Sequence, residues 1–304
     1  YGKIDLDNPA NVLNSVDRSA VGVTLNSGVT LKGTQSGQVG LADVDIYSMN
    51  YVNMINNGAI NLSGSNSVGI YTDNGTITNN AAVSTTGANS AGLYGENSTV
   101  INNASGGTIT IGSSGVGIYG VSYQNLSNIQ TYGSGTINIK NDGTITANAG
   151  TEAIGIYANN NKPGGTIADS NVNLSTGTIN VQNSENGIGV YANKSTLTGG
   201  AASITVGKNG TGIYAKDSNV SLTGSTINLY GDNSLGLYID GNSNFTGSGT
   251  INIAGQNVIL FNMATSGTVT NNFTVGTVAA GSTYTLGNIS GGVFQYTGNT
   301  ALSS

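Results

Sequence analysis

A short motif of glycine, an aliphatic residue and tyrosine recurs along the chain and constrains its fold more than any other feature. The motif occurs in full at residues 69–71, 92–94, 117–119, 155–157, 189–191, 212–214 and 236–238, and degenerate copies end at Thr24, Tyr47 and Phe261. The steps between the last residues of successive copies are 23, 24, 23, 25, 38, 34, 23, 24 and 23 residues. A fixed period of this size is typical of a repeat architecture. The chain therefore repeats every 23 or 24 residues, with two insertions.

Each repeat contains three short segments that have the features of β-strands. The first ends near the motif tyrosine, and the second follows six or seven residues later, with the apolar positions Ile77, Val100, Leu197, Val220 and Phe245. The third has a Thr-Ile pattern, as at 108–111, 178–181, 226–229 and 250–253. Alternating β-branched and polar residues between turn-forming residues indicate strands, and no segment sustains a helical period. We predict an all-β parallel β-helix with about three strands per coil and about ten or eleven coils.

The unusual composition agrees with stacked coils. Equivalent side chains of successive coils would lie ~4.8 Å apart, so a repeated charge would face a like charge at close range. The chain accordingly has 14 acidic and 8 basic residues among 304, whereas it has 48 glycines. We expect backbone hydrogen bonds to join the coils, and glycine and asparagine to supply positive-φ or tight corners.

The same composition excludes several classes of function. The chain contains neither cysteine nor histidine, so disulfides, thiol nucleophiles, Cys or His zinc sites and Ser-His-Asp triads are absent. A net charge of −6 and a single arginine, Arg18, argue against a nucleic-acid partner. No apolar run approaches the roughly 18 residues of a membrane helix, so we expect no membrane insertion by this segment. The chain begins at Tyr1, and we interpret it as a segment of a longer protein.

The alternation of side chains along a strand predicts where the tyrosines point. The residues one and three positions before each motif tyrosine are mostly apolar, so we expect both rows to face inward and the intervening glycine and the tyrosine to face outward. This predicts a surface column of candidate binding residues: Tyr71, Tyr94, Tyr119, Tyr157, Tyr191, Tyr214 and Tyr238. Beside a trough of glycines, such a column would offer sugar rings or a partner protein a flat platform. Two alternatives stay open: the stacked rings have a purely structural role, or the parity is reversed and the rings lie inside.

The two insertions interrupt the period at about residues 121–135 and 159–168. Extra length in a solenoid leaves at a corner and projects from one face, which is often the binding face. We expect both insertions to follow the tyrosine strand in adjacent coils, so the candidate loop residues are Tyr123, Gln124, Tyr132 and Lys162. Neutral surface loops are the alternative. We interpret residues 1–304 as one domain, in which 262–304 form irregular terminal coils because the period weakens there.

The motifs also carry a family resemblance. The runs 67–71 and 74–80, together with the parallel run 115–119, resemble passenger-domain repeats of large type V autotransporters, most of all those of the long fusobacterial outer-membrane autotransporter adhesins. The resemblance covers about residues 20 to 261. It implies a right-handed β-helix on the extracellular face of the bacterial outer membrane, with a barrel domain elsewhere in the full chain. It also implies attachment to a host-cell glycan or surface protein, or to partner bacteria.

Parallel β-helices also serve functions other than adhesion. Pectate lyases and tailspike glycosidases also use parallel β-helices, but their chemistry needs cationic bases with Ca²⁺ ligands or paired carboxyls. The pattern of turn-forming residues places the acidic residues, including Asp73 and Glu96, in ordinary turns, so we expect no enzyme, no metal and no cofactor. The Thr-x-Thr pairs are too irregular for an ice-binding lattice. The hypothesis is therefore a cell-surface adhesin segment, and the main alternative is a stalk that spaces a distal binding region.

Overall fold

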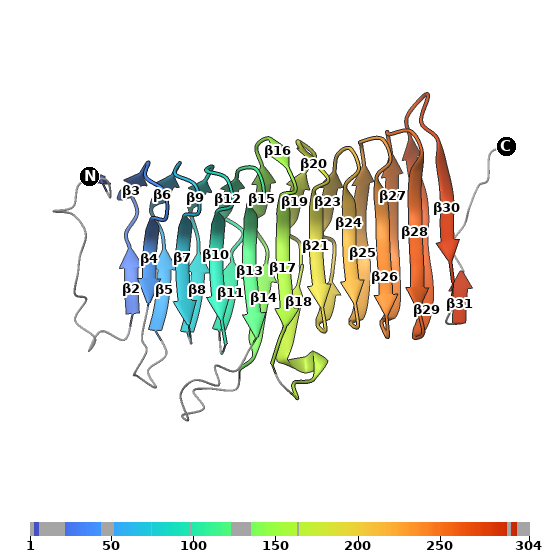
Figure 1. Ribbon diagram of the computed structural model, residues 1–304, viewed down its shortest axis with the longest axis horizontal. Helices are drawn as coiled ribbons and strands as arrows, with labels where there is room; N and C mark the ends of the chain where they lie inside the picture. Colours follow the sequence, from blue (N-terminus) through green and yellow to red (C-terminus); the bar gives the residue numbers. More distant parts are fainter. Residues whose placement is uncertain are drawn as a thin grey trace.

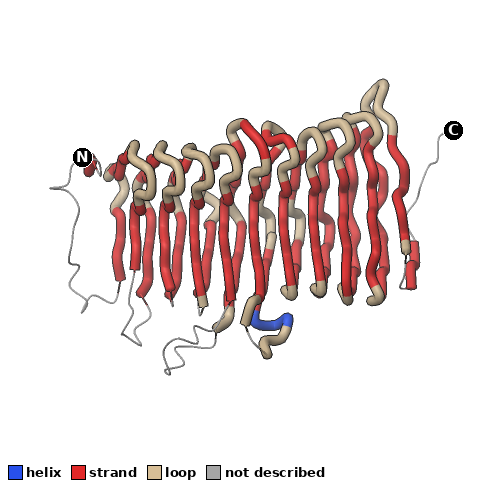
Figure 2. Tube along the Cα trace, viewed as in Figure 1, coloured by secondary structure: helices blue, strands red, loops and turns tan. Residues whose placement is uncertain are grey.

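The chain folds into a parallel β-solenoid of about nine turns (Figure 1). The computed structural model describes residues 3–5, 22–43, 52–73, 75–97, 99–122, 135–162, 164–290 and 293–296. Its strands stack along a rod, with the first described strands at one end and β30 and β31 at the other, and strands dominate the secondary structure (Figures 1 and 2). In the described residues no helix is long and apolar enough to cross a membrane.

The rod has three faces, which differ in the strand that each turn contributes. The first, here called the tyrosine face, is a sheet of ten strands. They are β4 (Val39–Asp43), β7 (Val68–Asp73), β10 (Ala91–Glu96), β13 (Val116–Ser122), β17 (Ile154–Asn160), β21 (Ile188–Asn193), β24 (Thr211–Lys216), β26 (Leu235–Gly241), β28 (Val258–Thr265) and β30 (Tyr284–Ile289).

The second face follows the tyrosine face along the chain. Its separate strands are β2 (Gly22–Leu25), β5 (Val52–Asn56), β8 (Gly75–Asn79), β11 (Thr99–Asn103), β14 (Ile137–Asn141), β18 (Ser170–Asn173) and β22 (Thr196–Gly199), and β31 (Val293–Tyr296) pairs at its far end. The third face consists of β3 (Thr30–Gly33), β6 (Ala59–Leu62), β9 (Ala82–Thr85), β12 (Thr108–Ile111), β15 (Thr144–Ala147), β19 (Thr178–Val181) and β23 (Ser203–Val206), and β1 (Lys3–Asp5) pairs with β3.

Long strands join the second and third faces in the later turns. β25 (Asn219–Leu229), β27 (Asn244–Ile253) and β29 (Thr268–Val278) each run through both faces, with a register slip at the bend between Thr223 and Ser225 of β25. A two-stranded sheet of β16 (Gly150–Thr151) and β20 (Ser184–Glu185) lies at the corner before the tyrosine face. The 3₁₀ helix η2 (Ile167–Asp169) lies at the corner before the second face (Figure 2).

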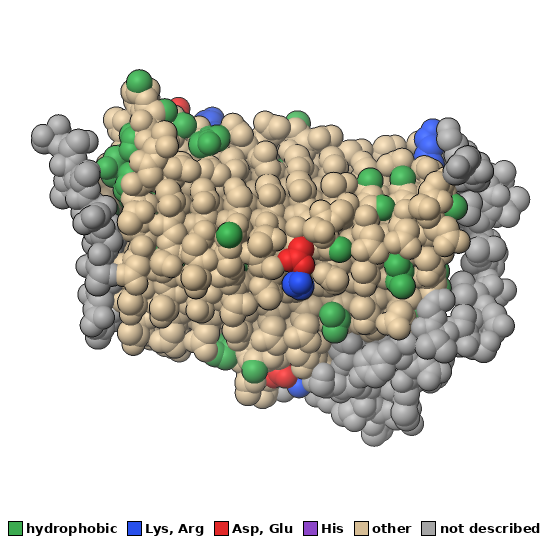
Figure 3. Space-filling model, turned by 180° about the vertical axis from the view of Figure 1, so that it is seen from behind, with side chains coloured by type: hydrophobic (Ala, Val, Ile, Leu, Met, Phe, Trp, Pro, Cys, Tyr) green, Lys and Arg blue, Asp and Glu red, His purple; other side chains and the backbone are tan. Residues whose placement is uncertain are grey.

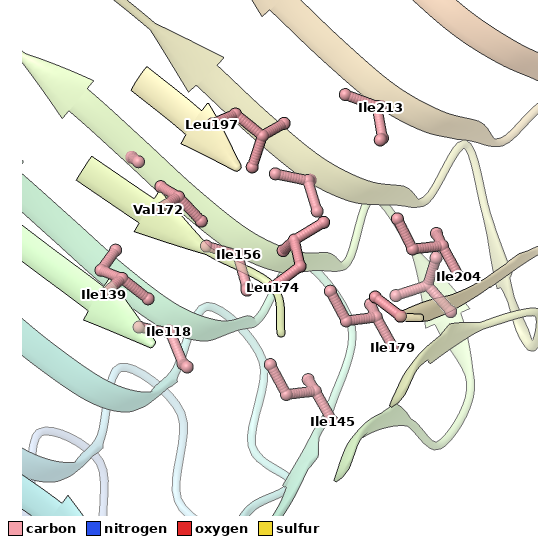
Figure 4. Packing of buried hydrophobic residues seen from close by; sticks show 14 of the residues in the cluster. Ile118, Ile139, Ile145, Ile156, Val172, Leu174, Ile179, Leu197, Ile204 and Ile213 are labelled. Atoms are coloured by element: carbon pink, nitrogen blue, oxygen red, sulfur yellow. The ribbon is translucent and has the colours of Figure 1, made fainter. Parts of the chain in front are cut away.

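Columns of aliphatic side chains fill the shaft of the rod, one column from each face. Ile118 and Ile156 belong to the tyrosine face, Ile139 and Val172 to the second face, and Ile145 to the third (Figure 4). All five are at most 2% exposed. One turn cannot bury these side chains alone, so the core forms only as the turns stack.

The glycine of the repeat motif faces inward, which corrects our prediction for that strand. In β13 the burial pattern places Val116 partly outside, whereas Gly117 and Ile118 are both buried and Tyr119 points out. The strand ladder pairs Val116 and Ile118 with their counterparts and passes over the glycine. Two consecutive inward residues shift the alternation by one position. The row three residues before the tyrosine, which we predicted to be core, is therefore half-exposed, while the row one residue before it is core as predicted.

A packing constraint explains the inward glycine. A Cβ atom built on Gly117 would lie 2.4 Å from Cγ2 of Ile145 and 2.5 Å from the carbonyl oxygen of Gly155. Gly92 and Gly155 show the same contacts to their own third-face isoleucines. The tyrosine face approaches the third face too closely to accept any side chain at this position.

The outer copies of the repeat align differently from our prediction. Leu41 and Ala42 of β4, not residues 46 and 47, pair with Ile70 and Tyr71, and Tyr47 lies outside the described residues. Phe261 pairs with the buried Leu237, so Asn262 takes the tyrosine position of that turn.

Two further residues, Thr24 and Val100, lie elsewhere than predicted: one belongs to a different face, and the other points outward instead of into the core. Thr24 belongs to β2, which pairs with β5 of the second face. Val100 was also assigned wrongly, because Ile101 pairs with Ile77 in the core and Val100 is 42% exposed. The copies that end at Thr24 and Phe261 lack the tyrosine that fixes the register of the full motif.

Positive-φ residues form the corner before the tyrosine face, as the sequence predicts. Asn66, Asn89, Asn209 and Asn233 have φ between 54° and 57°. Their backbone N–H groups donate to carbonyl oxygens of the next turn, as from Asn89 to Ser113. Asparagine accepts the left-handed conformation more readily than other non-glycine residues, so it is favoured at this corner.

A buried asparagine ladder crosses four turns at the corner between the second and third faces. The Nδ2 atom of Asn56 donates to Oδ1 of Asn79 (2.8 Å), Asn79 to Asn103 (2.9 Å), and Asn103 to Asn141 (2.7 Å). By the register of β14 and β18, the buried Leu174 occupies the next position. The Nδ2 atom of Asn141 is consequently left without a hydrogen-bond partner among the described residues.

We expect Gly117→Ala to lower the free energy of unfolding by about 1–3 kcal/mol, because the new methyl group must displace Ile145 or the neighbouring backbone. Val116→Ala, one residue earlier on the half-exposed row, is the control and should cost less than about 1 kcal/mol. Denaturant unfolding followed by circular dichroism measures both. Equal losses would contradict the inward orientation of the glycine.

The asparagine ladder predicts that the same Asn→Leu substitution changes stability by different amounts in the middle of the ladder and at its end. Asn103→Leu leaves the Nδ2 of Asn79 without its acceptor while Asn141 stays orphaned, so it should destabilise by about 1–3 kcal/mol. Asn141→Leu leaves Nδ2 of Asn103 without its acceptor, but it also removes the Nδ2 of Asn141, which has no partner in the parent. The number of unpaired amide groups stays the same, so the net change in stability should be near zero. Thermal unfolding midpoints of the two variants test this difference, and the reverse order would refute the ladder's role.

Candidate functional site

The seven motif tyrosines form one continuous column on the tyrosine face. They are paired in register from β7 to β26, and all seven are partly exposed. Their ring centroids are 4.7 to 5.2 Å apart from one turn to the next. This spacing is close to the distance between neighbouring strands, so the sheet itself determines it. The structure thus places the sequence-predicted tyrosines side by side on the outside of the rod.

The rings adopt two arrangements along the column. The pairs Tyr71–Tyr94 and Tyr94–Tyr119 are edge-to-face, with interplanar angles of 77° and 75°. From Tyr119 to Tyr238 the rings are stacked, with interplanar angles between 4° and 11°. Both faces of Tyr157, Tyr191 and Tyr214 are therefore covered by neighbouring tyrosines. A partner that approaches these three residues meets ring edges and hydroxyl groups.

The surface beside the column differs from the expected glycine trough. The glycines point into the core, and the outward neighbours of the rings are the half-exposed residues three positions earlier, such as Val116, Ile154 and Ile188. The tyrosine face consequently combines a phenol column with a parallel row that is mostly aliphatic.

On the side of the rod away from the view of Figure 1, most of the surface belongs to neither hydrophobic nor charged side chains (Figure 3).

At the first turns of the column, one carboxylate contacts the tyrosine hydroxyl groups and lies beside an aspartate–asparagine pair. The hydroxyl groups of Tyr71 and Tyr94 both donate to the carboxylate of Glu96, the former over 3.4 Å. Glu96 pairs in register with Asp73, whose Oδ1 accepts a hydrogen bond of 2.6 Å from Nδ2 of Asn97. Burial raises the pKa of Asp73, the bond from Asn97 lowers it in part, and the charge of Glu96 raises it.

Sequence reasoning placed Asp73 and Glu96 in turns, whereas both end strands of the tyrosine face. Their strand parity relative to the tyrosines was the signal that could have joined them to the column. Within the described ranges, no group of three or more Asp, Glu, His or Cys residues is arranged to hold a metal ion.

Burial raises the pKa of three phenol groups of the column, those of Tyr119, Tyr191 and Tyr214. It raises the pKa of Tyr119, and the neighbouring Tyr157 and Glu96 raise it further. The pKa values of Tyr191 and Tyr214 are also raised, in both cases mainly by burial, with additional contributions from charges on adjacent residues. Tyr119, Tyr191 and Tyr214 therefore present neutral hydroxyl groups at physiological pH.

The two insertions begin at the same corner of the rod, in adjacent turns. One lies between β13 and β14 and the other between β17 and β18. Their bases are in contact, because Oγ of Ser122 lies 3.3 Å from Oδ1 of Asn160 and also donates to the carbonyl oxygen of Gly135. Tyr123, Gln124 and Tyr132 lie outside the described residues.

Lys162 connects the two ends of the second insertion. Its Nζ lies 3.1 Å from Oδ1 of Asp169, and its backbone N–H donates to Oδ1 of Asn160. Burial opposes ionisation of Asp169, but hydrogen bonds from Thr166 and Lys162 lower its pKa. Lys162, which we predicted as a candidate contact residue, thus forms an ion pair within the insertion with Asp169, whose carboxylate remains ionised.

Comparisons with known proteins provide no assignment for this surface. No protein-family model, no curated protein and no solved structure matches the chain significantly.

The raised tyrosine pKa values predict a loss of stability in alkali. The folded state retains these phenol protons to higher pH than the unfolded chain, whose tyrosines titrate near 10.0. The free energy of unfolding attributable to them should therefore hold below about pH 10 and decrease as the pH rises through the raised pKa values. Thermal unfolding at about pH 9 and about pH 11 measures the decrease.

The matched control for the alkaline effect is the triple variant Tyr119→Phe, Tyr191→Phe and Tyr214→Phe, which keeps the ring stack but removes the titrating groups. Its midpoint should decrease less between the two pH values. An equal or larger decrease would show that lysines or backbone strain, not the column, cause the effect.

Proposed function

We propose that this chain is a passenger segment of a bacterial cell-surface adhesin of the type V autotransporter class. It would lie on the extracellular face of the outer membrane and attach to a host-cell glycan or surface protein, or to partner bacteria. The proposal includes a right-handed solenoid, since connections between parallel strands of one sheet are overwhelmingly right-handed. It also includes about ten or eleven coils of three strands.

The observation that carries this proposal is the common origin of the two insertions. In an otherwise regular rod, two adjacent turns project extra chain from one corner, next to the tyrosine column. Additions to a solenoid tend to collect on its binding face. The half-exposed tyrosine and aliphatic rows beside that corner add apolar contact area of the kind that is enriched in protein interfaces.

A stalk that spaces a distal binding region is the alternative, and two observations favour it. The ring faces in the middle of the column are covered by each other, and Lys162 is paired with Asp169. Both features stabilise the rod without any partner. In this case the insertions would be neutral loops and the column would supply about 0.5–1.5 kcal/mol per ring pair.

Shortening both insertions separates the two functions. Residues 123–134 and 161–168 would each be replaced by two residues, the length of the link between β21 and β22. We expect binding of the labelled protein to epithelial cells or to bacterial biofilm partners, measured by flow cytometry, to decrease at least about tenfold. The reason is that contact residues are removed while the stacked turns remain.

The control for the shortened protein removes extra chain from the opposite corner of the same turns. Residues 148–151 would be replaced by a Gly-Ser pair, which approximates the shorter link between β12 and β13. This control should bind as the parent does. Undiminished cell binding by the shortened protein would favour the stalk.

A further inference from the structure

A cavity of about 200 Å³ opens on the outer surface of the second face. It lies across β11, β14, β18 and β22, and its lining includes Ile139 and Val172, whose side chains are buried in the shaft. Neither the tyrosine column nor its hydroxyl groups belong to it. The cavity is smaller than the roughly 300–1,000 Å³ typical of sites for drug-sized ligands, so it suits a single small ring.

Two rows of outward side chains form the walls of the cavity, and each row runs across neighbouring strands from turn to turn. The first wall consists of Val100, Asn138, Asn171 and Thr196, which are paired in register from turn to turn. Val100 is an exposed aliphatic side chain, and the other three carry amide or hydroxyl groups. The first wall therefore offers one apolar contact beside several hydrogen-bonding groups.

The second wall adds one charged residue, and its charge is balanced. It consists of Lys140, Asn173 and Thr198. Nζ of Lys140 lies 2.6 Å from Oδ2 of Asp142. Although burial opposes ionisation, hydrogen bonds from Lys140 and Ser175 lower the pKa of Asp142, so the carboxylate stays charged. The ion pair leaves the cavity close to neutral on a protein of net charge −6, which disfavours an anionic ligand.

The insertions shape this cavity directly. β14 and β18, the strands that follow the two insertions, supply six of its nine lining residues. Nδ2 of Asn171 donates to the carbonyl oxygen of Ala168 (2.8 Å), and Oγ1 of Thr196 donates to that of Ile167 (3.3 Å). The first wall is thereby fastened to the insertion that precedes β18.

We propose that this cavity binds one neutral pyranose ring of a glycan. The amide groups of Asn138 and Asn173 and the hydroxyl group of Thr198 would bind the sugar hydroxyls, and Val100 would contact the apolar C–H face of the ring. The Oδ1 atoms of Asn138 and Asn173 already accept hydrogen bonds from Nδ2 of Asn171 and from the backbone N–H of Ser175, so their Nδ2 groups would donate to the sugar hydroxyls. The hydroxyl group of Thr198 donates to the carbonyl oxygen of Val172, so its oxygen would accept from the sugar. This inference rests on the proposed role in attachment and names the ligand class for it.

The test compares two identical substitutions on one row of the second face. Thr198→Arg fills the cavity, whereas Thr246→Arg places the same side chain at an exposed threonine two turns away, outside it. Titration calorimetry with the methyl glycosides of glucose, galactose, mannose and N-acetylglucosamine measures binding. We expect Thr198→Arg to weaken the best ligand at least about tenfold and Thr246→Arg to leave it unchanged.

Lys140→Gln tests the charge of the ligand, because glutamine keeps a hydrogen-bond donor but removes the cation. Binding of neutral glycosides should persist in this variant within about threefold. Preference of the parent for sialic or uronic acids, with loss of binding in Lys140→Gln, would overturn the inference of a neutral ring.

The remaining outcomes separate this inference from the proposed function. Equal binding by the parent and Thr198→Arg, or no binding of any neutral glycoside by the parent, would overturn the saccharide site. Cell binding that still depends on the insertions would then leave the adhesin proposal intact. A parent protein that binds glycosides but no cells would contradict the adhesin proposal and retain the saccharide site.

Discussion

Hydrogen bonding between equivalent residues of successive turns is the constraint on which the rest of this structure depends. Each strand finds its partners one turn earlier and one turn later, at a spacing near 4.8 Å, so every residue type is multiplied along the rod. Aliphatic side chains gain contacts from this multiplication, and the amides of Asn79 and Asn103 gain a donor and an acceptor. A charge would meet a like charge instead. The scarcity of Lys, Arg, Asp and Glu is thus a consequence of the registration.

A second constraint follows from the small cross-section of the rod. The tyrosine face and the third face lie close together. The isoleucine of the third face occupies the space that a side chain at the motif glycine of the tyrosine face would need. Gly117 provides this space opposite Ile145, and the same exchange occurs at Gly92 and Gly155. The motif glycine is therefore a packing requirement of the core. Its position two residues before the tyrosine also directs the ring outward, because the glycine and the following aliphatic residue both face inward before the alternation resumes.

The sequence predicts what repetition makes visible. The period, the three strands per turn and the column from Tyr71 to Tyr238 all follow from a residue type that recurs at a fixed step. The inward slip at Gly117 was missed, because strict alternation assigns the glycine to the outside and gives no warning of the steric contact with Ile145. The cavity was missed for a related reason: it depends on how outward side chains such as Val100 and Asn171 leave space between turns, and no motif encodes it.

Function in such a rod depends on interruptions of its symmetry. A regular column offers the same contacts at every turn and cannot distinguish one ligand position from another. Three interruptions coincide between β10 and β18: the rings change from edge-to-face to stacked at Tyr119, the asparagine ladder ends at Asn141 against Leu174, and both insertions leave the corner. The cavity lies across the turns that contain these changes. Each interruption weakens the regular stacking locally, as the orphaned amide of Asn141 illustrates, and a selected function would explain why the weakening is retained.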